Sequence, residues 1–214
     1  MTARLVVLAS GNGSNLQAVL DATLDGRLDA RVVLVASNRA DAYALERVRL
    51  ANIPVHIAPY KHSEGSREAY DESLAAALKR AEPDLVVLAG WMRIFTPRFL
   101  NAFPGKVINL HPALPGAFPG TNAIARAFEA HSAGKINSSG CMVHYVVPEV
   151  DAGPVVAQMQ VPFLPGDTLS DFEARMHIAE HTILPIAIAI CLPKVTAAGQ
   201  ELSSSKLPAQ VERF

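Results

Sequence analysis

The stretch INLHPALPGAFPG, from Ile108 to Gly120, ends a short apolar run with an amide and an imidazole. Asn109 and His111 are two residues apart, so their side chains project to the same side if the chain stays extended. Pro112 favours that extension, because the residue before a proline is pushed towards β or polyproline geometry. An asparagine amide can donate to a developing oxyanion, and a histidine can transfer a proton near neutral pH. The pair therefore indicates catalysis at the end of a strand.

A catalytic histidine needs an orienting partner, and Asp151 in the turn EVDAGP is the candidate. Its carboxylate is expected to raise the pKa of His111, because it favours the imidazolium. The alternative is that Asn109 caps a turn and His111 is an ordinary surface histidine. No serine or cysteine stands in a nucleophile-elbow context, so the sequence favours direct acyl transfer between two bound substrates over a covalent enzyme.

A second candidate site is the glycine loop LASGNGSNLQ, which follows the first apolar run and opens a helical stretch. Gly11 and Gly13 allow a tight turn with exposed N–H groups, which together with the helix dipole favour a phosphate. Ser14 and Gln17 have capping-box spacing, which predicts Ser14 as the helix N-cap. Leu16 occupies the third glycine position of the dinucleotide motif, so the loop favours a phosphorylated metabolite over a dinucleotide. A tight turn that binds nothing is the alternative.

Alternating apolar runs and helical stretches must position these loops. Short β-branched runs, apolar on both alternations, are typical of parallel strands that are covered on both faces; they lie at 4–10, 31–37, 84–90 and 106–110. Stretches with helical spacing lie between them, at 15–26, 40–53 and 66–84. This alternation predicts an α/β fold with an open, mostly parallel twisted sheet and helices on both faces.

The second half of the chain predicts fewer strands and a long terminal helix. We expect a helix near Ala123–Ala133, strands at 141–147 and 154–163, and a long helix beginning near Thr168, which has capping-box spacing with Asp171. Pro185 is expected to interrupt that helix. The chain shows no internal repeat or linker. We therefore expect one domain over residues 1–192, followed by a C-terminal tail, 193–214, to which the sequence assigns no structure.

Composition bounds the possible partners. The chain has 214 residues, half of them apolar, and a net charge of −1, so nothing indicates nucleic acid or an anionic membrane. The longest apolar run, 183–192, is far shorter than the roughly 20 residues that span a bilayer. Cys141 and Cys191 have neither metal-site spacing nor a disulfide framework. The sequence thus predicts a cytoplasmic protein with small-molecule partners.

The segment HIAEH, from His177 to His181, offers a competing hypothesis. It matches the H-x-x-E-H zinc-peptidase motif, in which two histidines on one helical face bind zinc and the glutamate acts as base. A third protein ligand would be needed, and the residues that follow offer only Glu201 and Glu212. We therefore expect no metal site and treat zinc as the alternative.

Seven stretches together resemble the folate-dependent phosphoribosylglycinamide formyltransferase family: VLASGNGSNLQAVLDA, SNRADAYALERV, SREAYD, DLVVLAGWMRIFTP, VINLHPALPGAFPG, VHYVVPEVDAGPVV and EHTILP. The resemblance implies a Rossmann-like formyltransferase fold. It also implies transfer of a formyl group from 10-formyltetrahydrofolate to the amine of glycinamide ribonucleotide in de novo purine synthesis. Transfer would be direct, through a tetrahedral intermediate and without a metal.

The resemblance also assigns residues. Asn109, His111 and Asp151 match the family's catalytic trio. Ribonucleotide binding would fall to Gly13, Ser14, Asn15 and Glu180, and folate binding to Arg67, Met92, Arg93, Ile94 and Phe95 with Asn109. The implied enzyme would be a monomer or a homodimer. A formyltetrahydrofolate hydrolase and a non-catalytic module that binds a phosphorylated metabolite are the alternatives.

Overall fold

The computed structural model describes residues 2–60 and 65–192, and the tail expected at 193–214 lies outside them. Within the described residues, seven strands form one sheet in the order β3-β2-β1-β4-β5-β6-β7. The strands are β1 (Ala3–Leu8), β2 (Ala30–Ser37), β3 (Val55–Ile57), β4 (Leu85–Leu88), β5 (Val107–His111), β6 (Ser139–Tyr145) and β7 (Val155–Val161). The first five are parallel, whereas β6 and β7 pair antiparallel. The expected mostly parallel sheet is confirmed.

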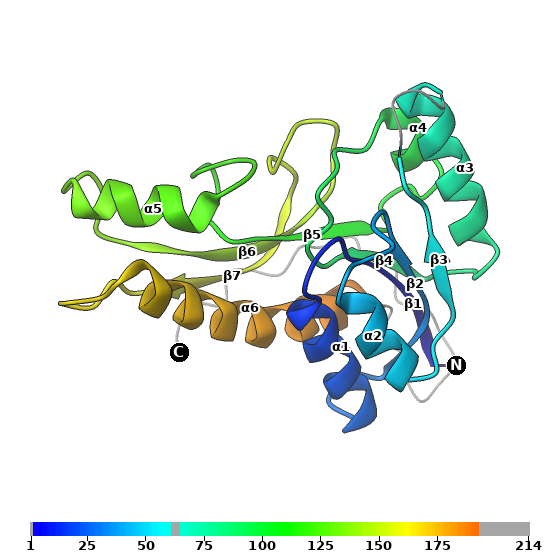
Figure 1. The fold of residues 1–214 in the computed structure, drawn as a ribbon, viewed down its shortest axis with the longest axis horizontal. Helices are drawn as coiled ribbons and strands as arrows, with labels where there is room; N and C mark the ends of the chain where they lie inside the picture. Colours follow the sequence, from blue (N-terminus) through cyan, green and yellow to red (C-terminus); the bar gives the residue numbers. More distant parts are fainter. Residues whose placement is uncertain (1, 61–64, 193–214) are drawn as a thin grey trace.

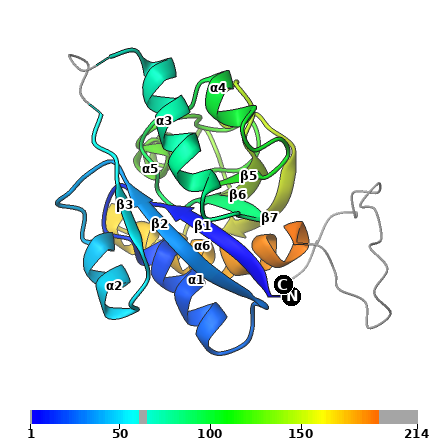
Figure 2. The same ribbon diagram turned by 90° about the vertical axis from the view of Figure 1, so that its right-hand side faces the viewer.

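Helices cover both faces of the sheet, as expected (Figure 1). They are α1 (Ser14–Leu24), α2 (Ala44–Leu50), α3 (Arg67–Lys79), α4 (Pro97–Leu100), α5 (Ala123–Ser132) and α6 (Leu169–Cys191). Figure 2 shows α1, α2 and α6 below the sheet and α3 and α4 above it. The loops at the carboxyl ends of the parallel strands are left between these two layers, where open α/β sheets bind their ligands.

Strand β1 shows why the sheet needs cover on both faces. Leu5 and Val7 belong to the core beneath α1 and α6, and Val6 and Leu8 belong to the core beneath α3 and α4. All four side chains are fully buried. A strand that is apolar at every position cannot alternate between core and solvent, so it lies in the middle layer of a three-layered fold, with helices on each face.

Two short elements, β3 and α4, were not expected from the sequence. Each is held by its neighbours, with β3 paired to the edge of β2 and α4 packed against α3. Periodicity has little to act on over three or four residues, so patterning alone does not identify such elements. Strand β3 forms one edge of the sheet.

The prediction that Pro185 interrupts the last helix was wrong. Helix α6 continues through Pro185 to Cys191, and the proline itself is buried among Ile183, Leu184 and Ile188. Burial of apolar side chains on both sides of the proline offsets the one helical hydrogen bond that it cannot donate. The predicted Thr168–Asp171 capping box at the helix start is confirmed. None of the described helices combines the length and apolarity that a membrane crossing needs.

Candidate active site

A cavity of about 420 Å³ opens at the carboxyl ends of β4 and β5. Its lining includes Asn109, His111 and Asp151, and also the segment 92–95 that follows β4. These residues come from three separate parts of the chain. The structure therefore brings together the three proposed catalytic side chains and most of the residues assigned to folate.

Strand β5 delivers Asn109 and His111 to the same side. Ile108 and Leu110 point into the core beneath α1 and α6, whereas Val107 belongs to the opposite core. Alternation then places Asn109 and His111 on the Val107 side, as expected. His111 is 4% exposed, so its imidazole is almost entirely enclosed by protein.

Asp151 lies in the turn between β6 and β7 and has a left-handed backbone, with φ of 52°. Gly153, two residues later, has to be a glycine because a Cβ there would collide with the carbonyl oxygen of Tyr145. The carboxylate accepts from the backbone N–H of Gly120 at 2.8 Å and from the amide nitrogen of Asn109 at 3.2 Å. The turn thus fixes the carboxylate against both strand β5 and the loop that follows it.

The imidazole of His111 lies between two oxygen acceptors. Its Nδ1 is 3.4 Å from Asp151 Oδ2, and its Nε2 is 3.1 Å from the carbonyl oxygen of Phe118. A carbonyl oxygen only accepts, so Nε2 carries a proton. If the ring takes up a second proton, both N–H groups face an oxygen. The surroundings are therefore complementary to the imidazolium.

Asp151 raises the pKa of His111, as expected, but a larger opposing effect was not foreseen. Burial lowers the pKa of His111 below its ordinary value, and this effect exceeds the opposing attraction of Asp151 and the contact with Phe118. The sequence could identify the carboxylate, but it could not weigh the carboxylate against the cost of enclosing a charged ring. His111 is neutral at neutral pH in the free protein, with acceptors already placed for its charged form.

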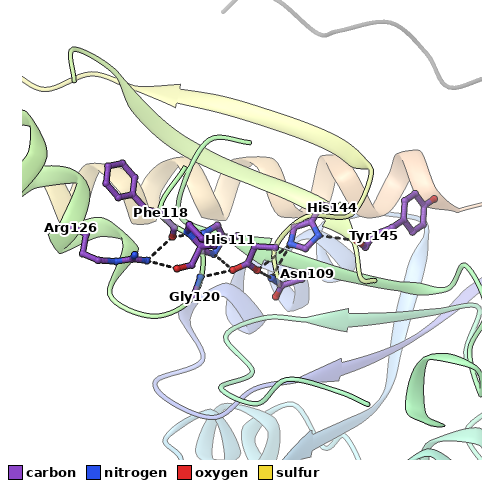
Figure 3. A network of polar contacts seen from close by, with 9 residues as sticks. Asn109, His111, Phe118, Gly120, Arg126, His144 and Tyr145 are labelled. Atoms are coloured by element: carbon purple, nitrogen blue, oxygen red, sulfur yellow. Dashed lines mark hydrogen bonds and ion pairs between the residues drawn. The ribbon is translucent and has the colours of Figure 1, made fainter. Parts of the chain in front are cut away.

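His144 is a site residue that sequence reasoning missed. It lies directly opposite Asn109 in the β5–β6 pair and is 2% exposed. Its Nδ1 donates to the carbonyl oxygen of Tyr145 at 2.9 Å, while Nε2 lies 3.2 Å from Asn109 Nδ2 and 3.5 Å from Asp151 Oδ1 (Figure 3). The predicted strand contained His144, but only the strand register reveals that it faces Asn109.

The amide nitrogen of Asn109 lies 3.2 Å from both Asp151 Oδ1 and His144 Nε2. An amide nitrogen has two hydrogens, so both can be engaged within the protein. A ligand oxygen must therefore compete for one of them. His144 and Asp151 hold the amide in a defined orientation until that happens.

The segment after β4 presents both its side chains and its backbone to the cavity. Met92 and Ile94 are exposed at its mouth, whereas the Phe95 ring is buried and stacks on Phe99 at 3.7 Å. The Arg93 guanidinium lies 3.9 Å from the centre of the Tyr60 ring. These contacts leave an apolar slot with a rigid back wall.

Arg67 does not line the cavity but braces it. Its guanidinium donates to the carbonyl oxygen of Ile94 at 2.6 Å. The backbone N–H of Met92 donates to the Ser10 hydroxyl at 3.0 Å, which ties this segment to the start of the glycine loop. The two candidate binding loops are therefore connected directly.

The prediction of Ser14 as N-cap was wrong. Helix α1 begins at Ser14, and its N-cap is Gly13, which has φ of 78° and makes no side-chain cap. A Cβ at Gly13 would lie 2.7 Å from the Cβ of Ala44, so helix α2 packs closely against the loop. Arg47 of α2 donates to both the backbone and the side-chain oxygen of Asn12 at 3.0 Å. A capless helix start leaves N–H groups free for an anion.

Three other groups meet beside this helix start. Glu180 of α6 is 4% exposed, and its Oε2 lies 2.6 Å from His177 Nδ1 and 3.5 Å from Asn15 Nδ2. The hydrogen bond that His177 donates to the Glu180 carboxylate raises the pKa of His177. Neither Glu180 nor the loop residues 13–15 line the cavity at the end of β5. The predicted ribonucleotide residues therefore form a neighbouring cluster.

The zinc hypothesis gains no third ligand from the structure. The rings of His177 and His181 stack with centres 6.4 Å apart, and Glu180 bonds to His177. Over residues 2–60 and 65–192, no group of three histidine, cysteine or acidic side chains could hold a metal ion. Glu201 and Glu212 lie outside the described residues.

Comparisons with known proteins agree on one family. The model of the family described as formyl transferase matches residues 3–188. The chain is 49% identical over 199 residues to a phosphoribosylglycinamide formyltransferase of Schizosaccharomyces pombe, covering 88% of this chain and 96% of that protein. It is 42% identical over 185 residues to the Escherichia coli protein of the same name, covering 86% of this chain and 85% of that protein.

A solved structure gives the same answer for the fold. Glycinamide ribonucleotide transformylase 1 from Symbiobacterium toebii superimposes with a TM-score of 0.82 at 41% identity, covering 94% of this chain and 93% of that chain. The Rossmann-like formyltransferase fold expected from the sequence is confirmed.

Proposed function

The chain belongs to the formyl transferase family, and on that premise we propose how its residues divide the reaction among them. Its activity is folate-dependent transfer of a formyl group from 10-formyltetrahydrofolate to the primary amine of glycinamide ribonucleotide, in purine biosynthesis. The observation that carries the division of roles is that Asn109, His111 and Asp151 line one cavity with segment 92–95.

In the proposed mechanism the amine attacks the formyl carbon, and negative charge develops on the formyl oxygen. Asn109 donates to that oxygen in exchange for its contact with His144. The C–N bond to the folate then breaks, and the proton lost by the amine reaches the departing folate nitrogen through His111 or a water. A metal takes no part in this proposal.

His111 suits the proton transfer because its neutral ring is poised between two acceptors. Burial keeps its pKa low in the free site, so the ring can take up the proton of the attacking amine. The resulting imidazolium then faces Asp151 Oδ2 and the Phe118 carbonyl. These two oxygens stabilise the protonated ring more than the neutral ring. Such stabilisation lowers the activation free energy of the reaction and does not only strengthen substrate binding.

Binding follows the two neighbouring clusters. The pteridine occupies the slot along Met92, Arg93, Ile94 and Phe95, braced by Arg67. The ribonucleotide phosphate lies at the uncapped start of α1, at Gly13, Ser14 and Asn15, with Glu180 beside it. The Ser10–Met92 hydrogen bond keeps the two clusters adjacent, as transfer between two bound substrates requires.

We also propose the domain organisation, the partners and the location of the enzyme. Residues 1–192 form the formyltransferase domain, and 193–214 are a tail outside the described residues. The partners are small molecules, without nucleic acid or membrane, and the enzyme acts in the cytoplasm as a monomer or a homodimer.

The test is an absorbance assay for the folate product with purified protein, glycinamide ribonucleotide and 10-formyltetrahydrofolate, run with and without chelator. We expect turnover that needs the ribonucleotide and survives the chelator. Equal folate consumption without the ribonucleotide would instead indicate a hydrolase. Ribonucleotide binding without turnover would indicate a non-catalytic module.

The His177–Glu180 pair leads to a pH prediction. Because Glu180 raises the pKa of His177, the imidazole stays cationic above its ordinary 6.5 and can attract the ribonucleotide phosphate. That attraction is present at lower pH and is lost as pH rises through the raised pKa. We expect the KM for ribonucleotide to rise about fivefold between pH 7 and 9, which corresponds to about 1 kcal/mol for a half-exposed charge.

Steady-state kinetics at fixed ionic strength would measure this dependence. His177→Gln should have a high and nearly flat KM for ribonucleotide, while His56→Gln on β3 should behave like the wild type. The other groups that act on His177 or on the neighbouring His181, namely Glu173, Arg47 and Asp21, are unchanged in both variants. A KM that changes equally for the folate would contradict a role at the phosphate.

A further inference from the structure

Loop 118–120 is hydrogen-bonded to both His111 and Asp151. The Phe118 carbonyl oxygen accepts from His111 Nε2 at 3.1 Å, and the Gly120 N–H donates to Asp151 Oδ2 at 2.8 Å (Figure 3). One short loop therefore supplies a partner to the outer nitrogen of the imidazole and to the carboxylate behind it. Displacing the loop would disturb both groups together.

The loop does not hold this shape through its own backbone preferences. Phe118 has φ of 45° and Asn122 has φ of 56°, a left-handed region that non-glycine residues rarely occupy. Gly116 and Gly120 on either side of Phe118 also have positive φ. Such a backbone persists only where its surroundings restrain it. The restraint has to come from outside the loop.

Arg126 of α5 supplies that restraint. Its NH2 group donates to the Phe118 carbonyl at 2.7 Å and to the Pro119 carbonyl at 2.6 Å. The side chain is half-buried, and among the described residues no ion pair includes Arg126. One nitrogen of the guanidinium, Nη2, thus donates to two neighbouring backbone carbonyls.

Arg126 contacts the loop and not the cavity, although its positive charge also lowers the pKa of His111. It is not among the residues that line the cavity of about 420 Å³, whereas Gly120, His111 and Asp151 are. A direct contact with substrate is therefore not its role. Because Arg126 lies behind the cavity wall, it can act on the site by fixing the orientation of that wall.

We propose that Arg126 is a positioning residue for formyl transfer, which holds loop 118–120 so that the Phe118 carbonyl and the Gly120 N–H fix His111 and Asp151. This inference rests on the proposed roles of His111 and Asp151. It goes beyond them by assigning the loop's restraint to a side chain on a different element, outside the catalytic cavity. The imidazolium that forms during proton transfer needs both acceptors in place, so the restraint acts on kcat.

The experiment compares Arg126→Met and Arg126→Lys with the wild type in the formyl-transfer assay. We expect Arg126→Met to lower kcat about tenfold with less than a twofold change in the KM for ribonucleotide. Arg126→Lys keeps the charge and a nitrogen with several N–H groups, but on a flexible stem without the planar guanidinium, so it should restore kcat only in part. The lysine variant also keeps the test open if the methionine variant fails to fold.

A double-mutant cycle separates positioning from simple structural support. In an Asp151→Asn background the carboxylate that the Gly120 N–H orients is gone, so Arg126→Met should cost less there than in the wild type. Full additivity of the two substitutions, or an effect on KM alone, would overturn the proposal.

Arg175→Met is the matched control. Arg175 on α6 also fixes a loop, donating to the Pro162 carbonyl at 2.7 Å and to Asp167, far from the catalytic cavity. This variant should lower the melting temperature and leave kcat unchanged. If the wild type itself shows no transfer, the proposed function fails and the positioning role fails with it. A normal kcat in Arg126→Met beside an active wild type removes the positioning role alone.

Discussion

Replacing His111 with alanine is expected to lower kcat for formyl transfer about a thousandfold. In the proposed mechanism the imidazole takes up the amine proton, and positioned acid–base groups contribute about 10²–10⁴ in rate. Removing it also leaves Asp151 Oδ2 and the Phe118 carbonyl without the ring that lies between them. The KM for ribonucleotide should change little, because its proposed binding residues form a separate cluster beside α1.

Steady-state rates, together with calorimetric binding of the ribonucleotide, would measure this effect. His56→Ala is the matched histidine control, since His56 lies on edge strand β3 and is not among the residues that line the cavity. A His111→Ala enzyme that keeps a tenth or more of the wild-type kcat would show that the proton is carried by another group. Loss of ribonucleotide binding in the same variant would instead point to a structural role.

The second large effect is expected for Asp151→Asn, with kcat lowered at least about a hundredfold. Although burial opposes ionisation, contacts with His144, the Gly120 N–H and His111 lower the pKa of Asp151 below its ordinary value. The carboxylate is therefore ionised at neutral pH and stabilises the imidazolium. An asparagine has one acceptor oxygen for these partners and carries no charge.

The pH profile distinguishes this role from a loss of shape. Asp151 raises the pKa of His111 against the effect of burial. Without the carboxylate that pKa falls further, so the acid limb of kcat/KM, which reports neutral His111, should move to lower pH. The measurement is kcat/KM between pH 5 and 8 for both enzymes, beside thermal unfolding. An acid limb that stays in place, or moves upward, would contradict the proposed pairing.

The sequence by itself determined the class of fold and supplied the reacting groups that we propose. Apolar runs such as residues 4–10 predict strands covered on both faces, because a strand without polar alternation has no face for solvent. Asn109, His111 and Asp151 were identified from residue type, spacing and the glycine and proline residues around them. These features are local, so they can be read from neighbours in the chain.

Tertiary structure alone decided which groups meet and what state they take. His144 faces Asn109 because of the antiparallel register of β5 and β6, and Arg126 reaches Phe118 because α5 returns to the loop. Neither pairing leaves a signal in spacing, since a register can slip without changing the pattern of either strand alone.

The protonation of His111 and the first residue of α1 were also decided by the tertiary structure. Burial outweighs the carboxylate at His111, and Gly13 replaces Ser14 as the N-cap because its bare backbone packs against Ala44. Desolvation and close packing are sums over atoms contributed by several elements. They exist only once those elements are assembled, whereas residue type and strand or helix periodicity are already present in the unfolded chain.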